Sequence, residues 1–330
     1  SCYGEIDRMK LLIPGGAGYI GSHMVRFAQE AGHEVVVIDD FSTGHRWAVS
    51  GCEVLEIDLL DRKSLFQSLE GREFDGAIHF AAKSLVGESV SRPAFYYRNN
   101  LVGTLNLVEA MLRIDVNNLV FSSTAAIFGN PVADKISEDL LKNPINPYGR
   151  SKLMVERVLE DICTANDLNA TCLRYFNAAG AHSSGEIGEA HEPETHLIPN
   201  IFKVAASREK KLEVFGNDYP TPDGICIRDY IHVTDLARAH LLSFEHMKKN
   251  KGFSAFNLGN GDGFSVLDII KGCERITQSE IPYMTRERRE GDPARLVSDS
   301  RSAKTTLLWS PQYTDIETIL ASAWIWHKHR

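Results

Sequence analysis

A tyrosine and a lysine four residues apart are the side chains of this sequence best suited to acid–base chemistry. Tyr148 and Lys152 follow Asn146-Pro147, which is typical of a helix cap and a first helical position. The spacing places both side chains on one helix face. That face continues with apolar residues, namely Val155, Leu159 and Ile162. The pattern predicts an inward-facing pair in which the lysine helps the phenol to act as a base. Taken alone, Tyr-x-x-x-Lys is common and is more often an exposed helix pair.

Two hydroxyl groups stand at the end of a predicted strand. Residues 118–122 read as a strand, and Ser123 and Thr124 follow it. Ligands of open α/β sheets bind at the carboxyl ends of the strands. We therefore expect Ser123 and Thr124 to project their hydroxyls toward Tyr148. The alternative is that these hydroxyls only cap local backbone groups.

A glycine-rich turn predicts a dinucleotide site. Residues 15–21 read Gly-Gly-Ala-Gly-Tyr-Ile-Gly, between a predicted strand at 10–14 and a predicted helix at 23–31. Glycines at this spacing permit the sharp turn and the approach of a pyrophosphate to the backbone. Asp39 ends the next strand, where a carboxylate accepts hydrogen bonds from ribose hydroxyls and repels a 2′-phosphate. Asp40 adds to that charge, while His45 and Arg46 oppose it. The pattern favours NAD over NADP.

The proposed base needs a lowered pKa. A phenol has a pKa near ~10, so work at neutral pH requires a shift of about three units, or roughly 4 kcal/mol. Lys152 and an oxidised nicotinamide, each ~5 Å away at an effective dielectric near ~20, would each supply about 3 kcal/mol. The two cations together are therefore sufficient.

The elements that must position these groups alternate along the chain. Strands are predicted at 10–14, 35–38, 52–57, 76–80, 118–122 and 171–176, and helices at 23–31, 63–69, 96–112 and after Pro147. This alternation predicts a Rossmann-type doubly wound parallel sheet with helices on both faces. We predict a cofactor domain over 9–176, with a returning segment near 228–250, and a smaller mixed α/β substrate-binding domain over 177–330.

Composition narrows the class of protein. The 330 residues suit about two domains of ~150 residues each, and 43% hydrophobic with 24% charged residues exclude a disordered chain. A net charge of −8 without long basic runs argues against nucleic acid. Six dispersed cysteines predict free thiols and no metal site. No apolar stretch is long enough to cross a membrane. We expect a cytoplasmic protein in which residues 1–8, before Met9-Lys10, are a leader or a remnant of expression.

Several motifs resemble the extended short-chain dehydrogenase/reductase family. They are Gly-Gly-Ala-Gly-Tyr-Ile-Gly-Ser at 15–22, His-Phe-Ala-Ala at 79–82, Tyr-Tyr-x-Asn-Asn at 96–100, Phe-Ser-Ser-Thr-Ala at 121–125, Pro-Tyr-Gly-x-Ser-Lys at 147–152 and Arg-Tyr-Phe-Asn at 174–177. Later motifs narrow the resemblance to the branch that epimerises UDP-glucose at C4′. These are Phe-Gly-Asn-Asp-Tyr-Pro-Thr-x-Asp-Gly at 215–224, Arg-Asp-Tyr-Ile-His-Val at 228–233 and Arg-Glu-Gly-Asp at 289–292.

The resemblance implies a set of binding and catalytic residues. The catalytic set is Tyr148, Lys152, Thr124 and Ser123, with Thr124 where the family usually has serine. The residues implied to hold NAD are Gly15, Gly18, Tyr19, Ile20, Gly21, Asp39, Asp40, Phe41, Ser42, Thr43, Gly44, Asp58, Leu59, Phe80, Ala81, Ala82, Lys83, Asn99, Tyr148, Lys152 and Phe176. Those implied to hold the UDP-hexose are Thr124, Tyr148, Asn177, His196, Leu197, Glu213, Val214, Phe215, Arg228, Tyr230, Arg289, Asp292 and Leu296.

The resemblance also implies an activity. It is the reversible epimerisation of UDP-glucose and UDP-galactose at C4′ through a 4-keto sugar, with Tyr148 as base and hydride passing to tightly bound NAD and back. Leu296 stands where a large aromatic residue restricts some members to simple hexoses, so N-acetylated UDP-sugars are the alternative substrates. The family is commonly dimeric through helices like those at 96–112 and 148–165, so a homodimer is expected.

Three other readings compete with this one. A nucleotide-sugar dehydratase or decarboxylase of the same fold needs an acid near Thr124, where this chain has Ala125-Ala126. A dinucleotide sensor without activity typically loses the Tyr–Lys pair. A secondary-alcohol dehydrogenase with exchangeable cofactor should lack the motifs at 215–230 and 289–292.

Overall fold

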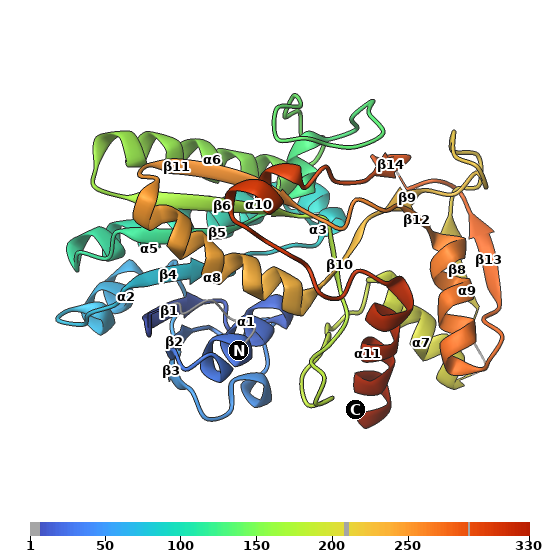
Figure 1. Ribbon diagram of the computed structural model, residues 1–330, viewed down its shortest axis with the longest axis horizontal. Coiled ribbons are helices and arrows are strands. Elements are labelled where there is room, and N and C mark those ends of the chain that lie inside the picture. The colour runs from blue at the N-terminus through green and yellow to red at the C-terminus, as the bar shows by residue number, and fades with distance from the viewer. Residues whose placement is uncertain (1–6, 208–210, 290) are drawn as a thin grey trace.

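A seven-stranded parallel sheet forms the centre of the larger part of the molecule (Figure 1). The computed structural model describes residues 7–207, 211–289 and 291–330. The strand order is β11-β6-β5-β4-β1-β2-β3, and every neighbouring pair is parallel. The strands are β1 (Lys10–Pro14), β2 (Glu34–Ile38), β3 (Glu53–Leu55), β4 (Gly76–His79), β5 (Asn118–Thr124), β6 (Asn169–Tyr175) and β11 (Phe253–Leu258). The predicted Rossmann-type fold class is confirmed.

Helices cover both faces of this sheet (Figure 1). The first face carries α1 (Tyr19–Glu30) and α8 (Val233–Lys249), and the second carries α2 (Arg62–Leu69), α5 (Gly103–Arg113) and α6 (Pro147–Ala165). The alternation of side chains explains the two layers, because Leu11 and Ile13 pack into one core while Leu12 packs into the other. Strands buried on both faces are the usual result of parallel pairing.

The helix predicted at 96–112 differs from the observed structure. The chain forms α3 (Val86–Ser91) and α4 (Pro93–Tyr97), then a π-helical turn over Arg98–Val102, and only then α5. Single π-helical turns are frequent at functional sites because they redirect side chains. Here the turn carries Asn99 to the pocket described below and Asn100 to the backbone of Lys83, where the Asn100 amide accepts from the Lys83 N–H at 2.8 Å and donates to its carbonyl at 3.0 Å.

A second core lies beyond the carboxyl edge of the large sheet. It joins α7 (Leu197–Ser207), α9 (Val266–Thr277), α11 (Ile316–His329), β8 (Leu212–Phe215) and β13 (Tyr283–Arg286) around buried Ile201, Phe202 and Ile269. The remaining elements are η1 (Arg46–Val49), η3 (Ala125–Phe128), β7 (Asn177–Ala179), β9 (Ile227–Arg228), β10 (Tyr230–His232), β12 (Phe264–Ser265), β14 (Arg295–Leu296) and α10 (Arg301–Thr306). The strand β11 belongs to the large sheet and α8 packs on it, although both come late in the chain. The chain therefore passes between the two parts more than once. The domain limits at 9–176 and 177–330 stay a prediction.

None of the described helices is long and apolar enough to cross a bilayer. The five cysteines within the described residues are free thiols. Residues 1–6 of the predicted leader lie outside the described part of the chain, and the cytoplasmic location stays a prediction.

Candidate active site

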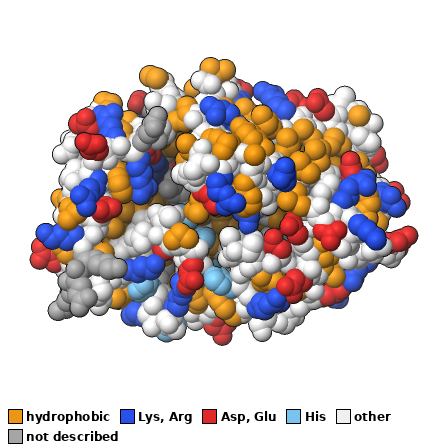
Figure 2. All heavy atoms as spheres, turned by 180° about the vertical axis from the view of Figure 1, so that it is seen from behind, with side chains coloured by type: hydrophobic (Ala, Val, Ile, Leu, Met, Phe, Trp, Pro, Cys, Tyr) orange, Lys and Arg blue, Asp and Glu red, His pale blue; other side chains and the backbone are white. Residues whose placement is uncertain are grey.

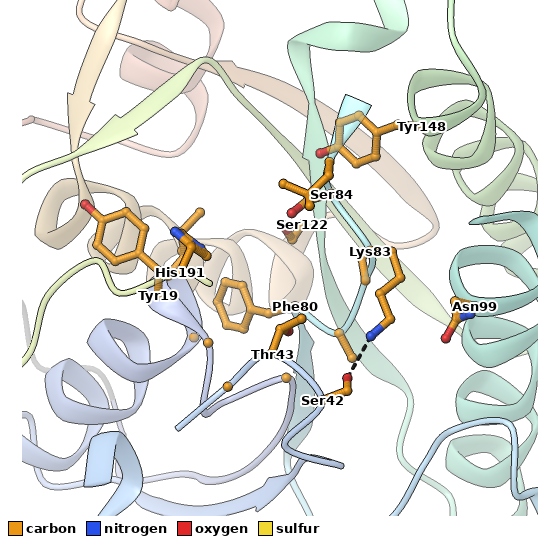
Figure 3. A pocket seen from close by; sticks show the side chains of 18 of the residues that line it. Tyr19, Ser42, Thr43, Phe80, Lys83, Ser84, Asn99, Ser122, Tyr148 and His191 are labelled. Atoms are coloured by element: carbon orange, nitrogen blue, oxygen red, sulfur yellow. Dashed lines mark hydrogen bonds between the residues drawn. The ribbon is translucent and has the colours of Figure 1, made fainter. Parts of the chain in front are cut away.

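A cavity of about 420 Å³ opens at the carboxyl edge of the large sheet (Figure 3). It lies where the strand order reverses between β1 and β4, which is the usual ligand position in doubly wound folds. Every residue predicted to hold NAD lines this cavity except Phe41. The centre of the Phe41 ring lies 4.2 Å from the guanidinium of Arg46. The backbone N–H of Phe41 donates a hydrogen bond to Asp39, which does line the cavity.

Gly15, Gly18 and Gly21 all line the cavity, but the packing of the fold requires a glycine at only two of these positions. A Cβ at Gly15 would lie 2.4 Å from the Ala81 nitrogen, and a Cβ at Gly21 would lie 2.1 Å from the Gly15 carbonyl. Gly15 is therefore required by the close approach of the segment after β4, and Gly21 by the packing of α1 on the turn. A Cβ at Gly18 would meet only the Gly15 carbonyl, at 3.6 Å. The fold does not need a glycine at Gly18, but a ligand that approaches its backbone does.

Asp39 ties the end of β2 to the glycine turn. Its carboxylate accepts hydrogen bonds from the backbone N–H groups of Ala17 and Phe41, each at 2.9 Å. Burial raises the pKa of Asp39, and these two hydrogen bonds oppose that shift. The carboxylate also lines the cavity, so it is positioned to accept from ribose hydroxyls. On the facing wall, Lys83 Nζ donates to the Ser42 hydroxyl at 2.7 Å (Figure 3).

The first turns of α6 bring Tyr148 and Lys152 to the end of β5. Asn146 caps this helix by accepting from the Gly149 N–H at 2.8 Å, as the sequence predicts. Lys152 is 3% exposed, and its Nζ donates to the Ser122 carbonyl at 2.7 Å. Burial lowers the pKa of Lys152 to about 7, although Glu156 raises it in part. Burial also raises the pKa of Tyr148, and a hydrogen bond with the Thr124 hydroxyl opposes that shift.

Only one of the two predicted strand-end hydroxyls faces the tyrosine. Thr124 lies beside Tyr148 in the cavity. The Ser123 hydroxyl differs from the expected direction, because alternation along β5 turns it away from Tyr148 and it donates to Glu156 at 2.6 Å. Glu156 also accepts from Arg174 at 3.0 and 2.8 Å in a buried ion pair. Ser123 therefore lines the cavity, while its hydroxyl fixes α6 on the sheet.

The residues predicted to hold a UDP-hexose fall into two groups. Thr124, Tyr148, Asn177 and His196 line the cavity. The others lie beyond its wall: Leu197, Glu213, Val214, Phe215, Arg228, Tyr230, Arg289, Asp292 and Leu296. Within the second group, Arg228 forms an ion pair with Asp292, and the Arg289 guanidinium lies 3.9 Å from the Phe215 ring centre.

Three residues of that second group make other contacts. Val214 and Tyr230 are buried in the second core, and Glu213 pairs with Arg286 on the surface at 2.8 Å. The structure does not bring these three side chains to the cavity wall. Their predicted contacts with substrate therefore lack support from this geometry.

Asp229, which lies in the motif at 228–233 but had no predicted role, fixes the strand that carries Arg228. Its buried carboxylate accepts from the N–H groups of Asn260 and Gly261, each at 2.9 Å, and from the N–H and hydroxyl of Ser298, at 3.0 and 2.8 Å. These bonds join three segments that are distant in sequence. Asp229 thus positions Arg228 and Leu296, which pair across β9 and β14.

Comparison with known proteins agrees with this geometry. Residues 11–259 match the NAD dependent epimerase/dehydratase family. The chain belongs to that family. It is 48% identical to a UDP-glucose 4-epimerase of Halalkalibacterium halodurans over 97% of this chain and 96% of that protein.

Two solved structures share the whole fold. UDP-glucose 4-epimerase from Brucella ovis in complex with NAD has 47% identity and a TM-score of 0.91, covering 95% of this chain and 97% of that one. The UDP-Glc/GlcNAc 4-epimerase of Campylobacter jejuni has 42% identity and a TM-score of 0.84, covering 97% and 99%.

One wall of the cavity was not predicted from the sequence. This wall lies opposite the dyad of Tyr148 and Lys152. It is lined by Glu189, His191, Glu192 and Pro193, together with the predicted His196. Burial lowers the pKa of His191, but the carboxylates of Glu189 and Glu194 outweigh burial and raise it to about 9. The spacing His191-x-x-Glu194-x-His196 was visible in the sequence, but only the fold brings Glu189 beside it.

The buried lysine predicts a pH-dependent stability. An ammonium whose pKa is lowered to about 7 costs stability when it is charged in the folded state, and this cost is present in full below pH 7. The cost is lost as the pH rises from 7 toward the unfolded pKa near ~10.4. We predict that Lys152→Met, free of cofactor, is more stable than the wild type by about 1–3 kcal/mol at pH 6, and that this advantage shrinks toward pH 10.

Urea unfolding from pH 6 to pH 10 measures the effect. Lys271→Met, at an exposed position of α9, is the control and should show no such pH dependence. A Lys152→Met advantage that is constant or grows with pH would contradict the assignment.

Proposed function

We propose that this protein interconverts UDP-glucose and UDP-galactose by epimerisation at C4′, with NAD bound throughout the cycle. One observation carries the proposal. A single cavity joins a glycine turn shaped for a dinucleotide to a Tyr148–Thr124 contact with a buried Lys152 beside it. The similarity to UDP-glucose 4-epimerases over nearly the whole chain supports the same reaction.

The residues present fit NAD. Gly18 lines the cavity and leaves room above its backbone, and α1 begins there with no side-chain cap and no acidic residue in its first turn. Uncapped N–H groups and a positive helix end bind a pyrophosphate. Asp39 would accept from the ribose hydroxyls. When bound, NAD supplies a reversible hydride acceptor.

Tyr148 would take the proton of the 4′-hydroxyl on its phenolic oxygen. A buried phenolate alone is unfavourable, and so is a buried ammonium, as the opposite pKa shifts of Tyr148 and Lys152 record. Side by side, the two charges stabilise each other, so the two ionisations are coupled. The Thr124 hydroxyl donates to the phenolate and holds it toward the sugar.

The second part of the molecule would hold the diphosphate while the sugar turns. Inversion requires that the 4-keto sugar present its other face to the cofactor, so the hexose must be held loosely and the diphosphate firmly. Arginine suits this task, since its guanidinium matches phosphate oxygens in a two-pronged geometry. Arg228 and Arg289 are proposed to do so, with Asn177 and His196 lining the cavity between them and the dyad.

A second activity follows from the residue at position 296. Leu296 is half-buried and packs against the cluster that contains Ala125 and Phe176, close to the end of β5. A leucine leaves more space there than a large aromatic side chain would. We propose that UDP-N-acetylhexosamines are also substrates, as the name of the Campylobacter jejuni enzyme states for that protein.

A homodimer is proposed for the face that carries α6. Val90 of α3, Val102 of the π-helical turn and Met154 of α6 are 64%, 42% and 43% exposed. Hydrophobic side chains gather on this face of the molecule (Figure 2). A two-fold axis would bring the same apolar surface of a second chain against it and remove both from water.

Replacing the phenol tests the reaction directly. We predict that Tyr148→Phe lowers kcat for UDP-galactose by about 10²-fold or more, because the proton acceptor is lost. Anomeric proton signals followed by NMR, with no NAD added, measure the interconversion. Tyr97→Phe, at a tyrosine outside the cavity wall, should retain activity. Full activity of a folded Tyr148→Phe would refute the proposed base.

Enlarging position 296 tests the second activity. We predict that the wild type epimerises UDP-N-acetylgalactosamine, and that Leu296→Tyr loses this activity by about 10-fold or more relative to UDP-galactose, since one misplaced group in a pocket costs about 1–3 kcal/mol. The same NMR assay measures both substrates. Absence of UDP-N-acetylgalactosamine turnover by the wild type would remove the second activity and leave the first intact.

A charge on the α6 face tests the dimer. We predict that Met154→Glu weakens self-association by about 10-fold or more, because two carboxylates would be desolvated near the axis. Light scattering after size-exclusion chromatography gives the mass as a function of concentration. Ile325→Glu on α11 replaces a residue of similar exposure, 40%, and should leave the mass unchanged. A monomeric wild type would disprove this interface.

A further inference from the structure

Four side chains of one loop converge at the end of the cavity that is distant from Asn99. Glu189, His191, Glu194 and His196 each direct one nitrogen or oxygen atom to a common centre, and these atoms all lie within 4.8 Å of one another. His191 stands beside Tyr19 there (Figure 3), with their ring centres 6.2 Å apart. No metal site was predicted from the sequence, and the function proposed above uses only His196 of these four residues.

Four distances among these side chains, which involve both oxygens of Glu194, are close to the edges of a small tetrahedron. His196 Nδ1 lies 3.1 Å from Glu189 Oε1 and 2.9 Å from Glu194 Oε1. His191 Nδ1 lies 3.4 Å from Glu189 Oε1 and 3.7 Å from Glu194 Oε2. Zinc binds imidazole nitrogen at about 2.0–2.1 Å and carboxylate oxygen at about 2.0–2.2 Å, which gives tetrahedral edges of about 3.3–3.5 Å. The observed separations bracket this value.

One ring nitrogen of the cluster is buried without a hydrogen bond. His191 Nδ1 is closed to water and makes no hydrogen bond to any described residue, although it points at two carboxylates. The Glu194 side chain is 2% exposed. A metal ion that replaces the ring proton would bind the lone pair of this nitrogen and both carboxylates at once.

The backbone of the loop is held in place from outside the cluster. The Trp326 indole donates to the Glu189 carbonyl at 3.0 Å, and the His45 ring donates to the Ala190 carbonyl at 2.6 Å. Glu194 also accepts from the His196 N–H at 2.9 Å. Ligands fixed by such outer contacts lose little freedom when an ion binds, which favours affinity.

We propose that Glu189, His191, Glu194 and His196 form a binding site for one divalent transition-metal ion, of which zinc is the best match. Two imidazoles and two carboxylates are ligands that zinc accepts in a tetrahedral arrangement, whereas calcium and magnesium prefer all-oxygen sites with more ligands. The ion would clamp residues 189–196, which close one wall of the cavity. It would not touch the dyad, so its task is structural.

Metal binding to the purified protein with its cofactor bound tests the site. After treatment with a chelator, calorimetry with Zn²⁺ should show one equivalent bound, and Co²⁺ should give the visible absorption of a tetrahedral ion. We predict that Glu194→Gln and Glu189→Gln each weaken Zn²⁺ binding by about 10-fold or more. Zn²⁺ at 100 times its Kd should also raise the melting temperature of the wild type but not of these variants.

Glu192→Gln changes an exposed carboxylate of the same loop and is the matched control, which should bind Zn²⁺ like the wild type. The proposal is overturned if the wild type binds no Zn²⁺, if the bound Co²⁺ lacks the tetrahedral absorption, or if folded Glu194→Gln and Glu189→Gln bind as tightly as the control. In those cases the cluster consists of imidazole–carboxylate ion pairs only. None of these readouts depends on epimerase activity, so the proposed function stands or falls separately.

Discussion

The buried ammonium of Lys152 constrains how the rest of the site is built. A charge that is 3% exposed must be held by other groups, and here the Ser122 carbonyl and the face of Phe121, 4.8 Å away, hold it from β5. These contacts fix the position of helix α6 along the strands of the sheet. One turn beyond Lys152, Glu156 fixes the same position by accepting hydrogen bonds from Ser123 and Arg174, which are neighbours across β5 and β6. The catalytic pair and its anchor are thus successive turns of one helix.

The same sheet edge determines where the cofactor and the substrate meet. Gly15 and Gly21 allow the glycine turn to lie so close to the segment after β4 and to α1 that no Cβ fits at either position. This leaves the uncapped start of α1 facing the dyad across a single cavity. On the other side, the four hydrogen bonds to Asp229 hold β9 against the loops at 259–261 and 298. A diphosphate bound by Arg228, as proposed above, would then be fixed relative to Tyr148 although the two residues belong to different parts of the molecule.

Local patterns predicted most of the fold and the cofactor half of the site, because they act within one strand, turn or helix. The strand at 10–14, the cap at Asn146 and the glycine turn are of this kind. Orientation was harder. Ser123 and Thr124 are adjacent, and only the pairing of β5 shows that Ser123 faces Glu156. The π-helical turn at 98–102 was not predictable from periodicity, and the wall at 189–196 lies in a loop whose position depends on contacts with Trp326 and His45.

Burial makes the dyad a conditional base. Without a second charge, the site favours the neutral forms of both side chains, because burial raises the pKa of Tyr148 and lowers that of Lys152. Each positive group that enters the cavity lowers the free energy of the phenolate, and the phenolate in turn stabilises the charged form of Lys152. An oxidised cofactor beside the pair would therefore favour the phenolate, which can accept a proton, and a neutral cofactor would favour the phenol, which keeps it. A protein that must take a proton and return it in every cycle gains from this coupling, because the charge of the cavity itself reverses the direction of proton transfer.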